Sequence, residues 1–197
     1  MLAAATCLLA CKDSISLRKQ TLKSMKQLST LLPLHYSYCP SPIGLIELGA
    51  TAHALVTLYF VEEARHATAP VDAQNSESSA ASATILAMAE QQLREYFAHT
   101  RQHFDLPLHF QGTDFQQRVW RQLLTVPYSK TASYQTIANA LDNPKAVRAV
   151  GAANGQNPIS IIAPCHRIIG SNGRLIGYGG GLWRKEWLLK HEGYLLL

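Results

Sequence analysis

Residues 161–169 place a Pro-Cys-His-Arg sequence between two isoleucine pairs, and this stretch constrains the fold more than any other. Isoleucine is β-branched and apolar, so each pair predicts a short buried strand segment. Pro164 has no N–H to donate, so the chain should leave regular pairing there and hold Cys165 at a turn between two buried anchors. His166 and Arg167 offer a base and a positive charge, and both would favour the thiolate that acts as a nucleophile. The alternative is a buried structural cysteine beside a solvated His–Arg pair.

Positive charge is concentrated in the half of the chain that carries this stretch. The 197 residues have a formal net charge of +5, but the residues from Thr113 onward account for +6 and residues 1–112 for −1. A basic half favours a polyanionic partner such as nucleic acid, and a solubilising surface is the alternative. The length suits one large domain or two small ones, and a hydrophobic content of 47% is enough for a core.

The four cysteines lack the spacing of a disulfide framework, and no apolar run reaches the roughly 18 residues that a membrane span needs. A reducing cytoplasm is therefore the expected location. Residues 1–33 show no regular pattern and are interpreted as a disordered extension, with Met25 as a candidate start. A lipoprotein-like processing site at Cys11 is an alternative, but the positive start of a signal peptide is missing. A zinc site is another, and its ligands would be Cys7, Cys11, His35 and Cys39.

Residues 34–111 predict a small α/β domain that begins with strands. Apolar segments at 34–38, 44–48 and 53–60 indicate three strands joined by turns that contain proline and glycine. Short turns between consecutive strands predict an antiparallel meander.

The rest of this part predicts one helix. Residues 66–83 are rich in Ala, Ser and Thr without apolar periodicity, which is typical of a flexible linker. Helical spacing of apolar residues predicts an amphipathic helix over 84–98, and residues 106–110 suggest one more short strand. No residue of 34–111 stands out as chemically active.

Gly112 marks the expected boundary, and residues 112–197 predict a helical domain. Thr113 is a candidate N-cap for a helix over 114–125, which Pro127 ends. Ser133 caps a short helix over 134–141.

A tight turn at 142–144 leads into a second helix over 145–154, and the pair predicts a helix-turn-helix. The side chains of that second helix are small apart from Arg148 and, at the helix start, Lys145, whereas a reader of base edges carries several long polar side chains. Small residues allow close approach to the duplex backbone, so we expect sequence-independent binding, through the minor groove. A packed alanine-rich core helix is the alternative.

Several segments surround the Pro-Cys-His-Arg sequence and extend its pattern: Asn157-Pro158-Ile159 upstream, then residues 177–181 and 185–193 downstream. Together they resemble the O6-alkylguanine-DNA alkyltransferase family from about Gly112 to the C-terminus. The ending from His191 is similar to the constitutive bacterial Ogt-type branch. The resemblance implies a ribonuclease-H-like domain followed by an all-α helix-turn-helix domain that binds DNA and accepts the alkyl group.

The family reaction moves an alkyl group from O6-alkylguanine to a cysteine that is used once, and O4-alkylthymine is a second candidate substrate. The resemblance implies a Cys165–His166–Glu192 relay, with Glu192 orienting the histidine. It also implies a flipped base, because the reactive atom lies inside the stacked duplex. Since Cys165 and His166 are adjacent in an expected extended chain, a bridging water would carry the proton between them.

Other positions match family roles residue by residue. Tyr134 matches the tyrosine that contacts the base and protonates the departing purine, and Asn157 matches an asparagine at the turn that holds the active-site strand. Tyr178 and Gly179 match the loop that closes over the base, and Ile168 the pocket floor. The DNA-binding and base-flipping set on the second helix is Arg148, Ala149, Gly151 and Ala152.

The resemblance implies double-stranded DNA as partner, a monomer, no membrane, and no cofactor. The zinc ligands of some animal relatives have no match here, so we expect no metal. Two other functions remain open: a binding-only alkyltransferase-like protein, which lacks the cysteine, and a cysteine hydrolase with an unrelated substrate.

Overall fold

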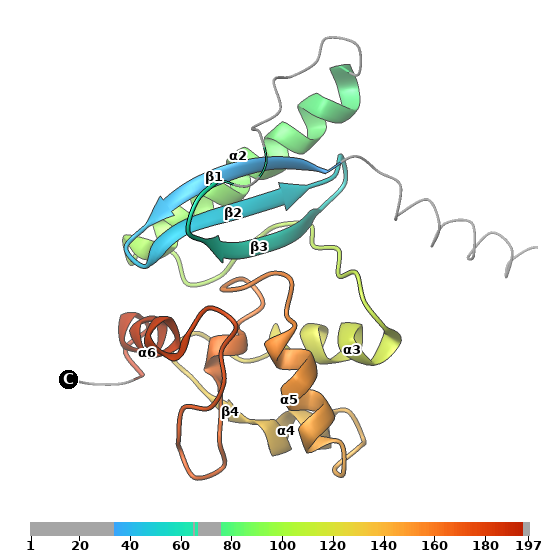
Figure 1. Ribbon diagram of the computed structural model, residues 1–197, viewed down its shortest axis with the longest axis vertical. Coiled ribbons are helices and arrows are strands. Elements are labelled where there is room, and N and C mark those ends of the chain that lie inside the picture. The colour runs from blue at the N-terminus through green and yellow to red at the C-terminus, as the bar shows by residue number, and fades with distance from the viewer. Residues whose placement is uncertain (1–33, 65, 67–75, 195–197) are drawn as a thin grey trace, which may run out of the picture. The chain divides into compact units, whose positions relative to one another are not determined.

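An antiparallel sheet of three strands opens the described part of the protein. The computed structural model describes residues 34–64, 66 and 76–194 (Figure 1). Strands β1 (His35–Ser41), β2 (Gly44–Ala50) and β3 (Leu55–Val61) pair in the order β1-β2-β3, so the predicted meander is confirmed. Beyond β3 the edge continues: Leu58 donates its N–H to the Pro158 carbonyl at 2.8 Å and accepts from the Ser160 N–H at 3.1 Å. The sheet therefore holds the segment that leads to Cys165.

Helix α2 (Ser76–Phe97) crosses one face of this sheet (Figure 1) and begins eight residues before the predicted start. The linker predicted over 66–83 is thus wrong for residues 76–83. Ser79 and Ser82 are buried in the first half, and the Ser82 hydroxyl donates to the Ser79 carbonyl at 2.9 Å. They continue the buried stripe of the helix, which consists of Ser79, Ser82, Ile85, Leu86, Ala89, Gln92, Leu93 and Tyr96. Hydrophobic periodicity does not mark these positions because the first two are small polar residues.

The strand predicted at residues 106–110 is only an isolated parallel bridge between Leu55 and Leu108. Leu55 donates to the Pro107 carbonyl at 2.8 Å and accepts from His109 at 2.9 Å. Pro107 has no N–H, so a longer ladder could not form through it.

Helix α3 (Asp114–Leu123) begins at Thr113, which confirms the predicted N-cap. The Thr113 hydroxyl accepts from the Gln116 N–H, and the Gln116 side chain accepts from the Thr113 N–H, which is a capping box. Trp120 on this helix is buried and donates its indole N–H to the Ala153 carbonyl at 2.7 Å.

That bond joins α3 to the helix-turn-helix, whose two helices are α4 (Tyr134–Ala140) and α5 (Val147–Gly155). Ser133 is the N-cap of α4, as predicted. Helix α5 starts two residues later than predicted because residues 144–146 still form the turn.

The stretch around Cys165 differs from the prediction on one side. Ile168–Ile169 form strand β5, which pairs in parallel with β4 (Ala132–Ser133). Ile161 and Ile162 are buried but lie in a turn, and Ile161 has a φ of +67°. Between this turn and β5, Cys165–Arg167 form a single 3₁₀ turn, η1. The extended chain expected at Cys165 and His166 is therefore also wrong. Helix α6 (Leu182–His191) lies three residues before the end of the described residues.

The predictions for residues 1–33 lie outside the described residues, as do two of the four zinc-site residues, Cys7 and Cys11. Of the other two, Cys39 is buried and His35 bonds through Nδ1 to the Ser82 hydroxyl at 2.7 Å. None of the described helices combines the length and apolar character needed to cross a membrane.

The first half of α2 can be tested by replacing an exposed alanine with glycine. Ala83 is exposed inside the helix, so Ala83→Gly should lower the free energy of unfolding by about 1 kcal/mol. The matched control is Ala64→Gly, which is exposed outside any helix and should change it by less than about 0.5 kcal/mol. Urea unfolding measures both, and equal small effects would mean that residues 76–83 are not helical.

Candidate active site

Cys165 lies at a cavity of about 200 Å³ that segments distant in sequence enclose. It is 4% exposed, and the cavity is open space beside an otherwise buried residue. The lining comes from β3, from the end of α5, and from the segments on either side of Cys165. These residues are Tyr59, Phe60, Asn154, Gly155, Asn157, Ser160, Cys165, Tyr178, Gly179 and Gly180.

The electrostatics of the thiol are dominated by burial, which raises the pKa of Cys165. A hydrogen bond with Asn157, the charge of Lys185 and the backbone N–H groups of residues 165 and 166 act in the opposite direction. The thiol is therefore neutral at pH 7 and needs a base to react. Arg167, expected to favour the thiolate, is turned away toward a carboxylate.

That carboxylate is Glu192, which follows α6 and is 2% exposed. Arg167 donates from Nε to Oε2 at 2.9 Å and from Nη2 to Oε1 at 3.0 Å, and from Nη1 to the Val126 carbonyl at 2.6 Å. His166 Nε2 lies 2.7 Å from Oε1 of the same carboxylate. The structure thus brings His166 and Glu192 of the predicted relay together, while Cys165 precedes His166 in the chain without a hydrogen bond between their side chains among the described residues. The solvated His–Arg alternative is wrong because both side chains are buried.

The tautomer of His166 follows from its partners. Glu192 is ionised: burial acts to raise its pKa, but the hydrogen bonds from His166 and Arg167 and the charge of Arg167 outweigh burial and lower it to about 2. An ionised carboxylate only accepts, so Nε2 of His166 carries the hydrogen. Burial lowers the pKa of His166, which keeps the ring neutral, and Nδ1 has no hydrogen-bond partner among the described residues. Nδ1 therefore presents a lone pair that can accept a proton.

Asn157 stabilises the turn that delivers Cys165. Its side-chain amide donates to the Ala163 carbonyl at 2.8 Å and its Oδ1 accepts from the Ile159 N–H at 3.1 Å. These bonds hold the segment in which Ile161 has a positive φ, a conformation that is costly for a β-branched residue.

Lys185 was not singled out by the sequence, although it lies beside the site. It is fully buried on α6, and Nζ donates to the carbonyls of Ile168, Ile176 and Gly177 at 2.6, 3.0 and 3.3 Å. Burial lowers the pKa of Lys185 to about 8. A signal did exist, because Lys185 shares helical spacing with the buried Leu188 and Leu189.

The loop that Lys185 holds carries two of the predicted substrate-binding residues, Tyr178 and Gly179, and both line the cavity. The other two predicted substrate-binding residues, Tyr134 and Ile168, do not line it. Tyr134 donates its hydroxyl to the Ile176 carbonyl at 2.8 Å and so braces the same loop. Ile168 was predicted to form the pocket floor, but it is fully buried, its carbonyl accepts from Lys185, and it does not line the cavity.

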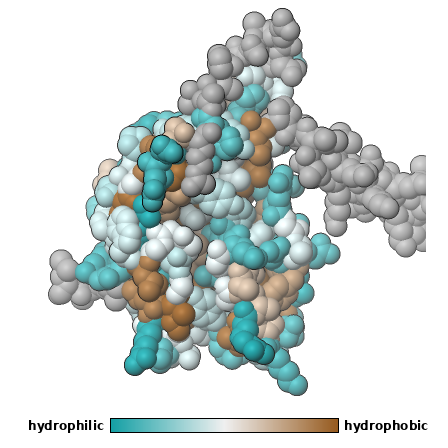
Figure 2. All heavy atoms as spheres, viewed as in Figure 1, coloured by the Kyte–Doolittle hydropathy of each residue, from teal (hydrophilic) through white to brown (hydrophobic). Residues whose placement is uncertain are grey.

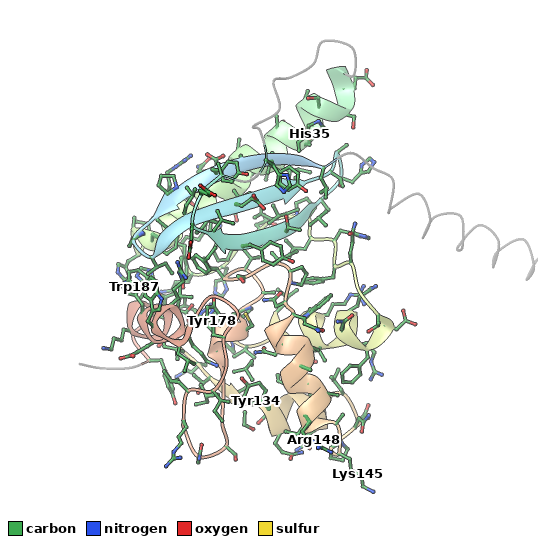
Figure 3. The ribbon with its side chains drawn as sticks, in the orientation of Figure 1. His35, Tyr134, Lys145, Arg148, Tyr178 and Trp187 are labelled. Carbon is green, nitrogen blue, oxygen red and sulfur yellow. The ribbon has the colours of Figure 1, made fainter. Side chains whose placement is uncertain are left out.

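Helix α5 presents a face of small residues. Arg148, Ala149 and Ala152 are exposed and Gly151 is half-buried, whereas Val150, Ala153 and Asn154 face the core. Figure 2 shows a pale to brown surface over this helix, and Figure 3 shows Arg148 and Lys145 pointing away from the helix at its far end. Gly155 at the other end lines the Cys165 cavity, so the exposed face runs from Arg148 to the cavity.

The buried carboxylate predicts a strong dependence of stability on acid. The pKa of Glu192 is about 2 in the folded protein against an ordinary 4.5. Its stabilisation, about 3 kcal/mol, is therefore complete above pH 4.5 and is lost as the pH falls toward 2. Burial of neutral His166 adds to the loss as the pH falls below about 6.5.

Urea unfolding at several pH values measures this dependence. We expect Glu192→Gln to lower the free energy of unfolding at pH 7 by about 3 kcal/mol and to flatten its slope below pH 4.5. The control is Glu186→Gln, which breaks an exposed pair with Lys190 on α6 and should leave the curve nearly unchanged. If stability fell as steeply with acid in Glu192→Gln as in the wild type, Glu192 would not be the source of the acid dependence.

Comparison with known proteins agrees with this geometry. Residues 34–110 match the family model "6-O-methylguanine DNA methyltransferase, ribonuclease-like domain", and residues 114–194 match "6-O-methylguanine DNA methyltransferase, DNA binding domain". The methylated-DNA–protein-cysteine methyltransferase of Mycobacterium tuberculosis is 45% identical over 163 residues, which cover 81% of this chain and 92% of that protein.

Solved structures give the same result. The crystal structure of the M. tuberculosis O6-methylguanine methyltransferase matches with a TM-score of 0.68 and 43% identity, covering 81% of this chain and 93% of that chain. The M. tuberculosis OGT in complex with DNA matches with a TM-score of 0.69 and 44% identity, covering 80% and 92%. The predicted fold class is confirmed, and the chain belongs to the 6-O-methylguanine DNA methyltransferase family.

Proposed function

We propose that the protein repairs DNA by direct reversal, moving the alkyl group of O6-alkylguanine to Cys165, with O4-alkylthymine as a second candidate substrate. The observation that carries the proposal is a buried cysteine at a cavity, followed in sequence by a histidine that a buried carboxylate orients. The family and the named activity of its relatives support the reaction class. The protein is thus a methylated-DNA–protein-cysteine methyltransferase in activity.

The proposed reaction conserves atoms and charge. The sulfur attacks the alkyl carbon, an S–C bond forms, and the C–O6 bond breaks with its electron pair going to the guanine oxygen. Nδ1 of His166 takes the thiol proton, through a water because the two groups are not hydrogen-bonded to each other. Tyr134, whose hydroxyl must first leave the Ile176 carbonyl, protonates the departing guanine. The phenolate then regains a proton from the His166 imidazolium through water, so that overall one proton passes from thiol to base. The thioether is stable, and each molecule reacts once.

The α5 face is proposed to bind double-stranded DNA. Its small residues, Ala149, Gly151 and Ala152, allow close approach to the backbone, and the cavity at its end is where a flipped base would enter. Arg148 is the long side chain within this face, so we assign it to the gap left by the base. Tyr178 and Gly179 would close over the base, and Asn157 holds the turn before Cys165.

The wider assignment includes a domain boundary near residue 111 or 112, a monomer and a cytoplasmic location. The ends of the two matched segments, at 110 and 114, support the boundary, and the cysteine usage supports the location. A binding-only protein is disfavoured because Cys165 is present. A hydrolase is disfavoured because a helix-turn-helix and a basic C-terminal half accompany the cysteine.

Mass spectrometry of the intact protein tests whether each molecule accepts only one alkyl group. Incubation with an oligonucleotide that contains O6-methylguanine should add one methyl group per protein, and peptide mapping should place it on Cys165. Cys165→Ser should show no adduct. The matched control Cys39→Ser changes a buried cysteine that does not line the cavity, and it should react normally. Turnover, or a methyl group on another cysteine, would contradict the proposal.

Base flipping can be separated from chemistry through Arg148. Unstacking a base costs a few kcal/mol, which an inserted guanidinium offsets in part. Arg148→Ala should slow transfer from duplex DNA by about tenfold or more, at the usual 1.4 kcal/mol per tenfold. It should scarcely change transfer from free O6-benzylguanine.

The matched control is Arg121→Ala, an exposed arginine on α3 whose removal deletes the same charge. It should leave the ratio of duplex to free-base rates unchanged. Equal losses on both substrates for Arg148→Ala would assign Arg148 to the fold instead.

A further inference from the structure

We propose that Tyr96, on α2, is a positioning residue for the His166–Glu192 pair. Its hydroxyl donates to Glu192 Oε1 at 2.8 Å, across 96 residues of sequence, and its side chain is fully buried. This inference rests on the proposed function, since it assigns a role to Tyr96 in alkyl transfer. It also gives residues 34–110 a direct part in the chemistry of the other domain.

The donors around Glu192 show what Tyr96 adds. Oε1 accepts hydrogen bonds from the Tyr96 hydroxyl, His166 Nε2 and Arg167 Nη2. Oε2 accepts hydrogen bonds from Arg167 Nε and, at 3.3 Å, from the Ser129 N–H. Tyr96 therefore shares an oxygen with His166. Arg167 holds the carboxylate from the side of η1 and Tyr96 holds it from the side of α2, so that Oε1 cannot move relative to the imidazole.

The phenol also sets how strongly Glu192 attracts the proton of His166. Burial and the neighbouring Glu192 charge raise the pKa of Tyr96 well above its ordinary value, so the phenol remains a donor. Each hydrogen bond to a carboxylate stabilises its charge and weakens its pull on the other donors. Tyr96 thereby limits the rise in the pKa of His166 that Glu192 causes, and Nδ1 stays free to accept the thiol proton at neutral pH.

Packing alone does not require a tyrosine here. The ring packs against the rings of Phe97, Phe104, Tyr128 and His191. A phenylalanine would keep all of these contacts and lose only the hydroxyl, so Tyr96→Phe isolates the bond to Glu192.

The test compares Tyr96→Phe with Tyr128→Phe. Tyr128 belongs to the same aromatic cluster, but its hydroxyl donates to the His191 backbone carbonyl at 3.3 Å rather than to Glu192. Both variants lose one phenol and keep one ring. The readout is the rate of Cys165 alkylation by free O6-benzylguanine as a function of pH, with thermal unfolding measured in parallel.

We expect Tyr96→Phe to react about tenfold more slowly at pH 7, because it loses one hydrogen bond to a charged group that orients the base, and about tenfold corresponds to 1.4 kcal/mol. The acid limb of its pH–rate profile should move to higher pH, because Glu192 then raises the pKa of His166 further. The groups that face Glu192 from the other elements, His166, Arg167, Tyr128 and His191, are unchanged in this variant. Tyr128→Phe should keep the wild-type profile.

A double-mutant cycle identifies the path. If Tyr96 acts through Glu192, then Tyr96→Phe should have no further effect on the rate in a Glu192→Gln background. Site-specific 3-fluorotyrosine at position 96, a stronger donor, keeps the ring and the hydroxyl and should move the acid limb to lower pH. This substitution keeps the test valid if Tyr96→Phe folds poorly.

The outcomes separate the two proposals. Wild-type protein that fails to alkylate Cys165 would overturn the proposed function itself. Wild-type protein that reacts, with a Tyr96→Phe profile superimposed on it whatever the change in thermal stability, would overturn only the role of Tyr96.

Discussion

The rest of the structure depends on the hydrogen bonds that stabilise the buried carboxylate of Glu192. Removing an ionised carboxylate from water is costly unless other groups replace its hydration. Here the replacements come from separate parts of the chain: Tyr96 on α2, the backbone of Ser129, and His166 and Arg167 on η1. Satisfying this one charge therefore joins helices α2 and α6 to the 3₁₀ turn that carries Cys165.

This arrangement divides the cations of the site between two tasks. Arg167 is adjacent in sequence to the reactive pair, yet its guanidinium neutralises Glu192. The charge that acts on the thiol is Lys185, whose ammonium group donates to three carbonyls of the segments that flank the cavity. A single buried ammonium thus holds the Tyr178 loop and favours the thiolate, while burial keeps the resting thiol neutral.

The position of the sulfur is set by a constrained turn. Residue 159 pairs with the edge of the sheet, Asn157 bonds the backbone on both sides of the turn, and Ile161 takes a left-handed conformation between them. An isoleucine adopts such a conformation only where the surrounding bonds outweigh its cost. The sheet therefore supports the nucleophile directly, which rationalises the presence of an α/β domain beside the helical one.

Local chemistry in the sequence determined much of this protein. Proline and glycine turns and apolar alternation predicted the meander, and Thr113 and Ser133 predicted two helix starts. Both predictions are confirmed because each depends on neighbouring residues. The pairing of His166 with Glu192 was expected only from the family resemblance, and these two side chains lie 2.7 Å apart. The tertiary structure decided the rest. Ser79 and Ser82 are buried only because a sheet lies against them, and Ile161 turns only because Leu58 and Asn157 hold its neighbours. Tyr96 and Lys185 look like an ordinary aromatic and an ordinary surface cation until folding places them beside Glu192 and Cys165, since contacts between distant residues leave no periodic trace in the sequence.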